Sequence, residues 1–237
     1  MGTAAELGGT VDQRLKQRLL ALSMGHEIVL DLHCDDEGVL YLYVPKALWP
    51  AMADCAAAMG VAAVILWDGT SGSSFDEASI HPYLRMPPNE ARLRDRVITT
   101  VEYRGLLDVD RDFARFDAEG LYRLLVGRGV IADPAAAPPA PFGGLVAPLE
   151  HVDVVTSPRA GAILFDVRPG DRVGRGERLA TIVHAPGEDR GSTDVLAPQS
   201  GYILTRANRR STRAGDDLVK LVGDAPSQTV HIGALEM

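Results

Sequence analysis

An internal repeat near the end of the chain strongly limits what this region can fold into. Residues 155–164 match residues 195–204 at an offset of 40 positions, and each copy has a Pro followed three positions later by a Gly. Pro158 and Pro198 therefore open equivalent turns. Helical periodicity is absent, and short β-type runs alternate with Gly, Pro and Asp, as in all-β domains. The repeat predicts a compact β sandwich in which each half covers the apolar face of the other.

The repeat also predicts which residues of the two halves correspond. Gly161 and Gly201 should allow equivalent close approaches of the backbone. Ile163 and Ile203 should fill matching core positions, and polar residues that alternate with core positions, such as Asp166, should face outward. The two halves should then be related by an approximate two-fold axis.

This β module, at residues 145–223, resembles the barrel-sandwich-hybrid fold of biotinyl and lipoyl domains. Such carrier domains present a Lys at the hairpin between their halves, and the cofactor is attached to it. Residues 182–194 occupy that place here and contain no Lys; the module has Lys220 alone, in its final strand. A carrier function is therefore not expected, and a structural or site-shaping role is left.

A Pro-rich segment at residues 133–144 divides the chain. No compact helix or strand tolerates this density of Pro, so the segment is predicted to be a linker. It separates an α/β region at residues 1–132 from the β module, and residues 224–237 form a C-terminal tail. The chain is therefore expected to contain two folded parts.

The first part of the chain alternates helical and strand patterns. Leu15, Leu19 and Leu22 recur on one face of a predicted helix, and continuous apolar runs are typical of strands that are buried on both faces. The alternation predicts an α/β layer with a partly parallel sheet and flanking helices. The expected helices cover residues 11–24, 48–59 and 113–129, the expected strands cover residues 27–33, 39–44, 61–67 and 97–103, and a Gly/Ser-rich loop covers residues 68–79.

Charge and composition narrow the range of partners. The formal net charge is −8 and the chain has three lysines, whereas nucleic-acid binding needs clustered basic residues. No apolar stretch is long enough to span a membrane, and no export signal is visible. Cys34 and Cys55 are therefore interpreted as reduced thiols. We expect a soluble cytoplasmic protein with a small-molecule substrate and no nucleic-acid or membrane partner; a homo-oligomer is compatible with these features.

The first candidate for chemistry is the run Asp31-Leu32-His33 at the carboxyl end of a predicted buried strand. Ligands bind beyond this end of the strands in open α/β sheets. A His at this position can offer a ring nitrogen to a metal, and a nearby carboxylate can orient the ring. The alternative is a His that merely ends a strand.

The second candidate is Glu102, which interrupts an apolar strand. A buried carboxylate is costly unless it is paired or functional. Strand alternation places Glu102 on the face opposite Val101 and Tyr103. A desolvated Glu beside a metal-bound water is a good general base. The alternative is a strand residue that faces solvent.

These motifs, in their order along the chain, resemble the succinylglutamate desuccinylase/aspartoacylase family, a branch of the zinc-carboxypeptidase fold. That family has a strand ending in Asp-Leu-His, a later strand reading Thr-x-Glu before a Gly-containing turn, and often a C-terminal β module. Here Asp31-Leu32-His33, the strand that contains Glu102 and ends at Gly105, and the β module follow in the same order. The resemblance covers about residues 11–223.

The resemblance implies a carboxypeptidase-like mixed sheet with flanking helices, and the activity of a zinc-dependent hydrolase. Such a deacylase cleaves an acyl-amide bond of a small amino-acid derivative. In this reading, His33 is one of three ligands to a single zinc ion, and Glu102 is the acid/base that activates the zinc-bound water. His33 and Glu102 should then lie close together on one face, at one rim of the sheet.

The chain also departs from the family pattern. The family takes its other two zinc ligands from an upstream His-x-x-Glu, which an Asn-Arg pair follows. No His-x-x-Glu precedes His33, where His26 is the only earlier His, and no Asn-Arg pair lies in that region. The resemblance therefore implies that about the first third of the catalytic domain is missing, and that this chain alone binds zinc weakly. The alternative is a non-catalytic remnant or truncated paralogue that acts as a binding or scaffold protein.

Five further residues are candidates for binding the substrate. An acidic turn follows His33 and could bind a cationic amine, although a solvated turn is the alternative. Two acidic residues in the Gly/Ser-rich loop could line the pocket, and two residues beside Glu102 could contact a carboxylate. These candidates are Asp35 in the turn, Asp76 and Glu77 in the loop, and Tyr103 and Arg104 beside Glu102.

Overall fold

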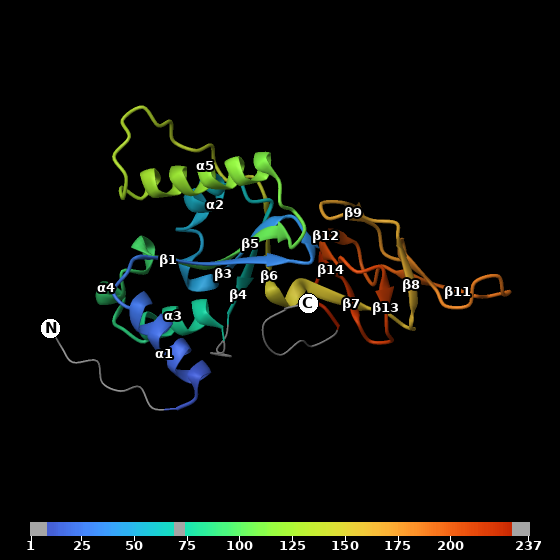
Figure 1. Cartoon of the computed structure of the whole chain (residues 1–237). Coiled ribbons are helices and arrows are strands. Elements are labelled where there is room, and N and C mark those ends of the chain that lie inside the picture. The colour runs from blue at the N-terminus through green and yellow to red at the C-terminus, as the bar shows by residue number, and fades with distance from the viewer. Residues whose placement is uncertain (1–8, 69–73, 229–237) are drawn as a thin grey trace.

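The α/β region folds around a five-stranded mixed sheet (Figure 1). The computed structural model describes residues 9–68 and 74–228 of the chain. The strands, in their order across the sheet, are β1 (Ile28–Asp35), β5 (Val97–Gly105), β3 (Leu40–Pro45), β4 (Ala63–Trp67) and β6 (Leu145–Pro148). The pairs β1–β5, β3–β4 and β4–β6 are parallel, while β3 and β5 are antiparallel. The expectation of a partly parallel sheet is confirmed.

Helices lie on both sides of this sheet (Figure 1). The helices α2 (Ala53–Met59) and α5 (Arg111–Gly127) pack against each other over one face. On the other face lies α3 (Phe75–Leu84), with α1 (Val11–Ser23) packed beside it. Three short helical turns complete this part, namely η1 (Lys46–Leu48), α4 (Pro88–Ala91) and η2 (Leu93–Asp95). No helix within the described residues is long and apolar enough to cross a membrane.

The ends of these helices follow from local side-chain chemistry. Thr10 and Gln13 form a capping box, in which each side chain accepts from the other residue's backbone N–H at the start of α1. Asp110 caps α5 in the same general way, because its carboxylate accepts from two backbone N–H groups of the first turn. Gly60 ends α2 with a φ of 69°, a left-handed conformation that Gly adopts without strain.

The helix α3 is the main element that the sequence pattern failed to predict. Residues 68–79 were expected to form a loop, but α3 begins at Phe75 after Ser74; residues 69–73 lie outside the described part of the chain. Ile80 and Tyr83 are buried under the sheet. The Gly- and Ser-rich start and the internal Pro82 hide the helical pattern, because both residue types normally break helices.

The β module consists of eight short strands whose pairing follows the sequence repeat. The strands are β7 (Val152–Thr156), β8 (Gly161–Phe165), β9 (Arg172–Val173), β10 (Arg178–Val183), β11 (Ser192–Leu196), β12 (Gly201–Arg206), β13 (Ser211–Thr212) and β14 (Asp217–Gly223). The pairs β8–β10, β10–β11 and β8–β13 have the counterparts β12–β14, β14–β7 and β12–β9. Each half therefore has the same set of strand contacts as the other.

The matched residues of the two copies also occupy equivalent environments. A Cβ added to Gly161 would run into the carbonyl oxygen of Val183, and one added to Gly201 would run into that of Val222. These two carbonyls stand at corresponding places in β10 and β14. The matched isoleucines of the two copies are both buried in the core of the module. The predicted close approaches of the backbone are therefore present in both halves.

The two parts of the chain exchange strands. Residues 145–148 were assigned to the β module, but they form β6, which pairs with β4 in the α/β sheet. In return, β2 (Glu37–Gly38) leaves the α/β region and pairs with β12 of the module. The turn η3 (Leu149–His151) then leads into β7, so the module's own strands begin at Val152. Residues 133–144 contain no helix or strand.

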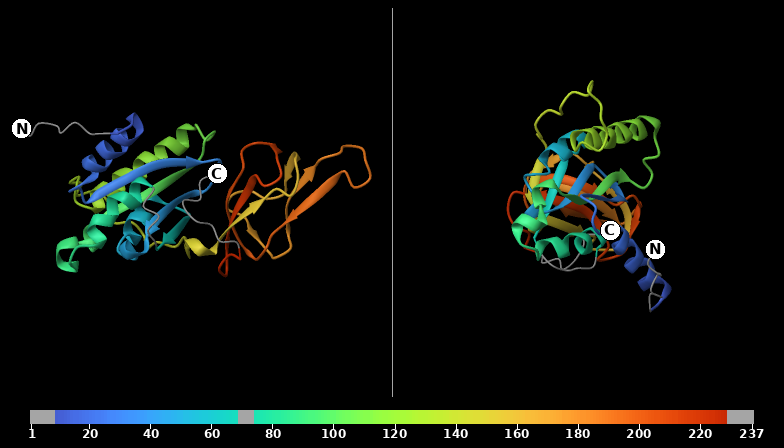
Figure 2. Two further views of the ribbon diagram at one scale, coloured as in Figure 1. Left: turned by 90° about the horizontal axis from the view of Figure 1, so that it is seen from below. Right: turned by 90° about the vertical axis from the view of Figure 1, so that its left-hand side faces the viewer.

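An apolar interface joins the module to the sheet. Tyr41 and Ile65 of the α/β sheet form one buried cluster with Val152, Leu204 and Val222 of the module. The module therefore lies at one end of the α/β part, as Figure 1 and the left view of Figure 2 show. This contact positions the module beside the ends of β1 and β5, where the candidate site lies.

Candidate active site

The two residues on which the predicted site depends are neighbours across two strands. His33 is registered with Glu102 in the parallel pair β1–β5, and Asp31 is registered with Thr100. Registered residues of neighbouring strands point to the same face of a sheet, so His33, Asp31 and Glu102 share one face. They stand near the carboxyl ends of both strands, where open α/β sheets bind ligands. The structure therefore brings His33 and Glu102 together as the sequence predicts.

A carboxylate orients the ring of His33. Oδ2 of Asp31, two positions earlier on the same face, lies 3.2 Å from Nε2 of His33. The side chain of His33 is 40% exposed, so the ring reaches solvent. A carboxylate that holds one imidazole nitrogen leaves the other available as a ligand. In this arrangement, Nδ1 of His33 is the nitrogen that could bind a metal.

Asp76 joins this group from the first turn of α3. Its carboxylate is buried and accepts a hydrogen bond of 2.6 Å from Oγ of Ser74. Burial raises the pKa of Asp76, and the charges of Glu77 and Asp31 act in the same direction. The helix α3 contacts both β1 and β5, the strands that carry Asp31 and Glu102. Of the two loop candidates, Asp76 therefore lies beside the predicted site.

A buried polar cluster lies beside Glu102 on the same face of the sheet, and the β module contributes its cation. Nζ of Lys220 donates to Oδ2 of Asp35 at 2.7 Å, and the hydroxyl of Tyr41 donates to the same oxygen at 2.7 Å. The hydroxyl of Tyr43 lies 3.5 Å from that of Tyr41, and Tyr41 is registered with Glu102. The carboxylate of Asp35 is therefore buried and bonded to Lys220 and Tyr41. It does not bind the substrate amine that the sequence suggested.

The electrostatics of this cluster favour a charged Lys220. Burial lowers the pKa of Lys220, but Tyr43, Asp35 and Glu102 together raise it above the usual value. Burial raises the pKa of Tyr41 well above its ordinary range, and the pKa of Tyr43 is also raised by burial. Both tyrosines are therefore neutral hydrogen-bonding groups, and the ammonium of Lys220 is the cation of the cluster.

The rest of the acidic turn after β1 pairs with arginines of the module. Glu37 accepts hydrogen bonds from Arg206 and, at 2.6 Å, from Arg210, and Asp36 lies 3.8 Å from Arg209. Burial acts to raise the pKa of Glu37, but the two arginines outweigh it and the pKa is lowered. The turn is therefore neither a free cation-binding loop nor a solvated turn; it is an ionic contact between the two parts of the chain.

Tyr103 and Arg104 serve the packing of α5 and do not join this group. Arg104 donates to both carboxylate oxygens of Asp117 at 2.9 Å, and its guanidinium lies 4.4 Å from the ring centre of Phe113. Tyr103 is on the opposite face from Glu102, as alternation predicts, and burial raises its pKa to about 12. The expectation that these two residues contact a substrate carboxylate is not supported by their positions.

Solved structures with the same architecture identify the fold. A structure from Shewanella frigidimarina, described as a succinylglutamate desuccinylase/aspartoacylase, matches 95% of this chain with a TM-score of 0.79 and 23% sequence identity. A protein of the same description from Shewanella amazonensis matches 92% of this chain with a TM-score of 0.79 and 24% identity. This chain has the fold of the succinylglutamate desuccinylase/aspartoacylase family. The resemblance that the sequence motifs suggested is confirmed at the level of the fold.

The chain spans about three-fifths of the length of these proteins. It covers 61% of the Shewanella frigidimarina chain, 60% of the Shewanella amazonensis chain and 65% of a Rhodobacter sphaeroides relative, which it matches with a TM-score of 0.69 and 20% identity. No family model and no curated protein matches the sequence. The family fold is therefore recognised from the structures.

The described part of the chain holds no group of three possible metal ligands. Among residues 9–68 and 74–228, no three His, Cys, Asp or Glu side chains are grouped so that they could hold a metal ion. A catalytic zinc normally has three protein ligands and a water. His33, held by Asp31, is suitable for one of them.

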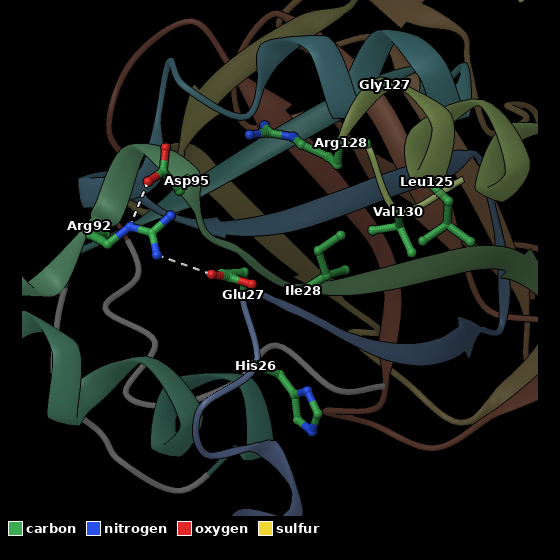
Figure 3. Close-up of a pocket in the computed structure, with 10 residues that line it drawn as sticks. His26, Glu27, Ile28, Arg92, Asp95, Leu125, Gly127, Arg128 and Val130 are labelled. Carbon is green, nitrogen blue, oxygen red and sulfur yellow. Dashed lines mark hydrogen bonds and ion pairs between the residues drawn. The ribbon is translucent and has the colours of Figure 1, made fainter. Parts of the chain in front are cut away.

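The hollow drawn in Figure 3 lies at the other end of β1 and is a separate feature. It has a volume of about 840 Å³ and is lined by residues that include His26, Glu27, Arg92 and Arg128. Arg92 is paired with Glu27 at 3.2 Å and with Asp95 at 2.9 Å. The charged groups that border this hollow therefore neutralise one another, and His33 lies five residues further along the strand that begins at its edge.

Lys220 is the residue near the site that sequence reasoning missed. It lies 185 positions from Asp35 in the chain and was considered only as a point for cofactor attachment. The available signal was its place in an otherwise apolar final strand, since a Lys there must find an anionic partner. The identity of that partner depends on how the two parts of the chain meet.

Proposed function

We propose that this chain supplies part of the active site of a zinc-dependent amide hydrolase. The reaction is the removal of an acyl group from a small amino-acid derivative, with a carboxylate and an amine as products. The observation that carries the proposal is the registered pair His33–Glu102 on one sheet face, with Asp31 on the His33 ring. The family fold supports it, because the neighbouring structures are described as desuccinylases and aspartoacylases.

The residues of this chain have separate roles in the proposal. Glu102 is the acid/base: it accepts a proton from the attacking water and later donates a proton to the leaving amine. Asp31 holds Nε2 of His33 and directs Nδ1 toward the metal. His33 is one zinc ligand, and the other two lie outside the described residues. Asp76, at the start of α3, borders the substrate.

The β module shapes the site from the other side. We propose that it has the barrel-sandwich-hybrid fold without its carrier function, and that its contacts with the turn after β1 restrict access to the site. A small-molecule substrate and a cytoplasmic location belong to the same proposal. In this arrangement the module forms one side of the site and carries no cofactor. The hairpin of residues 182–194 has no Lys to which a cofactor could be attached.

Zinc binding tests the role of His33 directly. Equilibrium dialysis of the whole chain against zinc should show weak binding, because three ligands are normally needed, and His33→Ala should remove it. Glu102→Gln should leave zinc binding unchanged. His184→Ala, in the module, is the matched control and should bind as the wild type does. Tight stoichiometric zinc that survives His33→Ala would show that His33 is not the ligand.

Hydrolysis tests the role of Glu102. The part of the Shewanella frigidimarina protein that has no counterpart here can be fused to this chain, and the fusion assayed on a panel of N-acyl amino acids. We expect hydrolysis that depends on zinc, and a fall of roughly 10²–10⁴-fold with Glu102→Gln. A fusion that binds zinc through His33 but hydrolyses no substrate would contradict the proposed reaction.

A binding or scaffold protein is the second candidate function. The observation that favours it is the lack of three grouped ligands among residues 9–68 and 74–228. If this candidate is correct, the chain should bind no zinc through His33, and Glu102→Gln should change neither the stability nor the activity of the fusion. The dialysis and hydrolysis experiments therefore separate the two candidates.

A further inference from the structure

The Pro-rich segment after α5 crosses the surface as a strap that is fixed at both ends. We call residues 134–142 the Pro strap; none of their side chains is charged or can form a hydrogen bond. At one end, the carboxylate of Asp133 accepts from the hydroxyl of Tyr122 on α5 at 3.0 Å. At the other, the ring of Phe142 packs edge-on against Trp49, with ring centres 5.8 Å apart. Figure 1 shows the strap as an arch on the side of the sheet that carries α2 and α5.

Sequence and burial both indicate a polyproline II conformation for the strap. Each Pro fixes its own φ, and each residue before a Pro is held in an extended conformation; together these two restraints cover residues 137–141. A polyproline II helix has about three residues per turn. Ala136, Pro139 and Phe142 are half-buried, while the residues between them are exposed. The strap therefore packs every third residue on the protein and turns the others to solvent.

The exposed residues form two Ala–Pro pairs that repeat along the strap. Ala137-Pro138 and Ala140-Pro141 stand one helical turn apart, so both pairs lie on the same side, roughly 9 Å from each other at about 3.1 Å per residue. The backbone of residues 137–141 makes no hydrogen bond to the backbone of any other described residue. Its carbonyl oxygens are therefore available to donors from another molecule.

A hollow lies beside each of the two pairs. The first has a volume of about 430 Å³ and is lined by Ala137-Pro138 together with residues of α2 and α5. The second, of about 460 Å³, is lined by Ala140-Pro141 together with residues of α2 and β6. Pro139 borders both hollows, and so does Asp54, which is paired with Arg128 at 2.7 Å. The surface thus repeats the same unit twice: an exposed Ala–Pro pair with a hollow at its side.

The chemistry of this surface selects the kind of partner. A charged peptide or ligand would gain no ion pair from residues 134–142. A second copy of the chain is also a poor fit, because a two-fold dimer sets the same surface against itself, and the three prolines of residues 137–141 have no N–H to offer the facing carbonyls. The partner has to bring apolar surface together with hydrogen-bond donors. Tyr and Trp side chains combine the two.

We propose that the Pro strap is a docking surface for a protein domain with an aromatic-lined groove. Aromatic side chains of the partner stack on Pro138 and Pro141 and extend into the two hollows, and a Tyr hydroxyl or Trp N–H donates to a carbonyl of the strap. Grooves of this kind bind Pro-rich segments because the polyproline II conformation is already formed and little entropy is lost. The anchors at Asp133 and Phe142 reduce that loss further.

The test measures binding of the whole chain to three probe domains that have such grooves: an SH3, a WW and an EVH1 domain. The whole chain is immobilised, each domain is titrated by surface plasmon resonance in buffer containing a metal chelator, and a polyproline peptide is added as competitor. At least one domain should bind reversibly and be displaced by the peptide. Because no zinc and no substrate are involved, failure of the proposed hydrolase would leave this result unchanged.

Variants of the strap make the test specific. Pro138→Ala combined with Pro141→Ala should weaken binding by about tenfold or more, because both rings on which the partner stacks are lost. Pro134→Ala is the matched control: it makes the same change at an exposed position of the strap outside both Ala–Pro pairs, and should bind as the wild type does. Circular dichroism and thermal unfolding confirm that each variant is folded.

Three results would overturn the proposal. The first is that none of the three domains binds the wild-type chain. The second is binding that the double variant retains, that Pro134→Ala weakens equally, or that the polyproline peptide does not displace. The third is self-association of the wild-type chain that the double variant abolishes, which would show that the occupant is a second copy.

Discussion

At the scale of single residues, the buried pair Lys220–Asp35 is the contact whose disruption should cost the most stability. Lys220 is 1% exposed and Asp35 is 8% exposed, and burial of either charge alone would be strongly unfavourable. The hydroxyl of Tyr41 completes the coordination of Asp35. The pair therefore connects the last strand of the module to the strand that carries His33.

Lys220→Met should destabilise the protein by about 3–5 kcal/mol, because it leaves the Asp35 carboxylate buried without its cation. The double variant Lys220→Met/Asp35→Asn should recover part of this loss, since no buried charge is then unpaired. Urea unfolding measures both. Lys46→Met is the matched control: Lys46 pairs with Asp68 at 3.7 Å on the surface, and its loss should cost less than about 1 kcal/mol. Equal costs for Lys220 and Lys46 would contradict the buried pair.

The same cluster predicts a loss of stability at alkaline pH. The pKa values of Lys220, Tyr41 and Tyr43 are raised in the folded protein. A group whose pKa is higher in the folded than in the unfolded protein adds stability at pH values below its unfolded-state pKa. This stability is lost as the pH rises through its folded-state pKa. The free energy of unfolding should therefore decline above about pH 10. Tyr41→Phe should flatten this decline, and an unchanged alkaline profile in that variant would be evidence against the assignment.

At the scale of elements, the sequence predicted the strands and the longer helices. It did not predict which residues from distant parts of the chain form pairs. The strands of residues 27–33 and 97–103 were found because apolar runs are local signals, and Glu102 was placed correctly because strand alternation is local too. The register of His33 with Glu102 followed from their equivalent positions at the strand ends. The partners of Lys220 and Glu37 lie far apart in sequence, and no local pattern encodes them.

Among the elements, the repeat was the most predictable feature, because both copies keep a Gly where the backbone of the facing strand comes close. Gly161→Ala and Gly201→Ala should each destabilise the protein by roughly 1–3 kcal/mol, since the added Cβ meets a carbonyl oxygen of the facing strand in both copies. Thermal unfolding gives the comparison. Gly174→Ala is the control, because a Cβ there meets only Glu177, at 3.8 Å. A large effect in one copy and none in the other would break the equivalence of the halves.

At the scale of the whole molecule, exchange of strands makes the two parts interdependent. β6 of the α/β sheet leads directly into the module, and β2 of the α/β region pairs with β12. The ionic contact of the acidic turn with Arg206, Arg209 and Arg210 lies beside this exchange. Neither part has its full sheet without the other, so unfolding should be a single transition.

Glu37→Gln tests this ionic contact. Glu37 is 25% exposed and bonds two arginines, one of which is half exposed. With allowance for solvent screening, its loss should cost about 1–2 kcal/mol. The cost should shrink at high salt, because partly exposed pairs are screened. Because the pKa of Glu37 is lowered in the folded protein, its contribution is present above the unfolded pKa and is lost as pH falls through the folded value.

Urea unfolding at low and high salt, and at neutral and acidic pH, gives the four values that this prediction needs. Glu119→Gln is the control, because Glu119 lies 3.8 Å from Arg123 on the exposed side of α5 and contributes little. The wild type should lose more stability than Glu37→Gln does, both on adding salt and on lowering the pH, whereas Glu119→Gln should follow the wild type. Parallel behaviour of Glu37→Gln and the wild type would mean that the apolar interface around Tyr41 and Leu204 holds the module in place without help from the ionic contact.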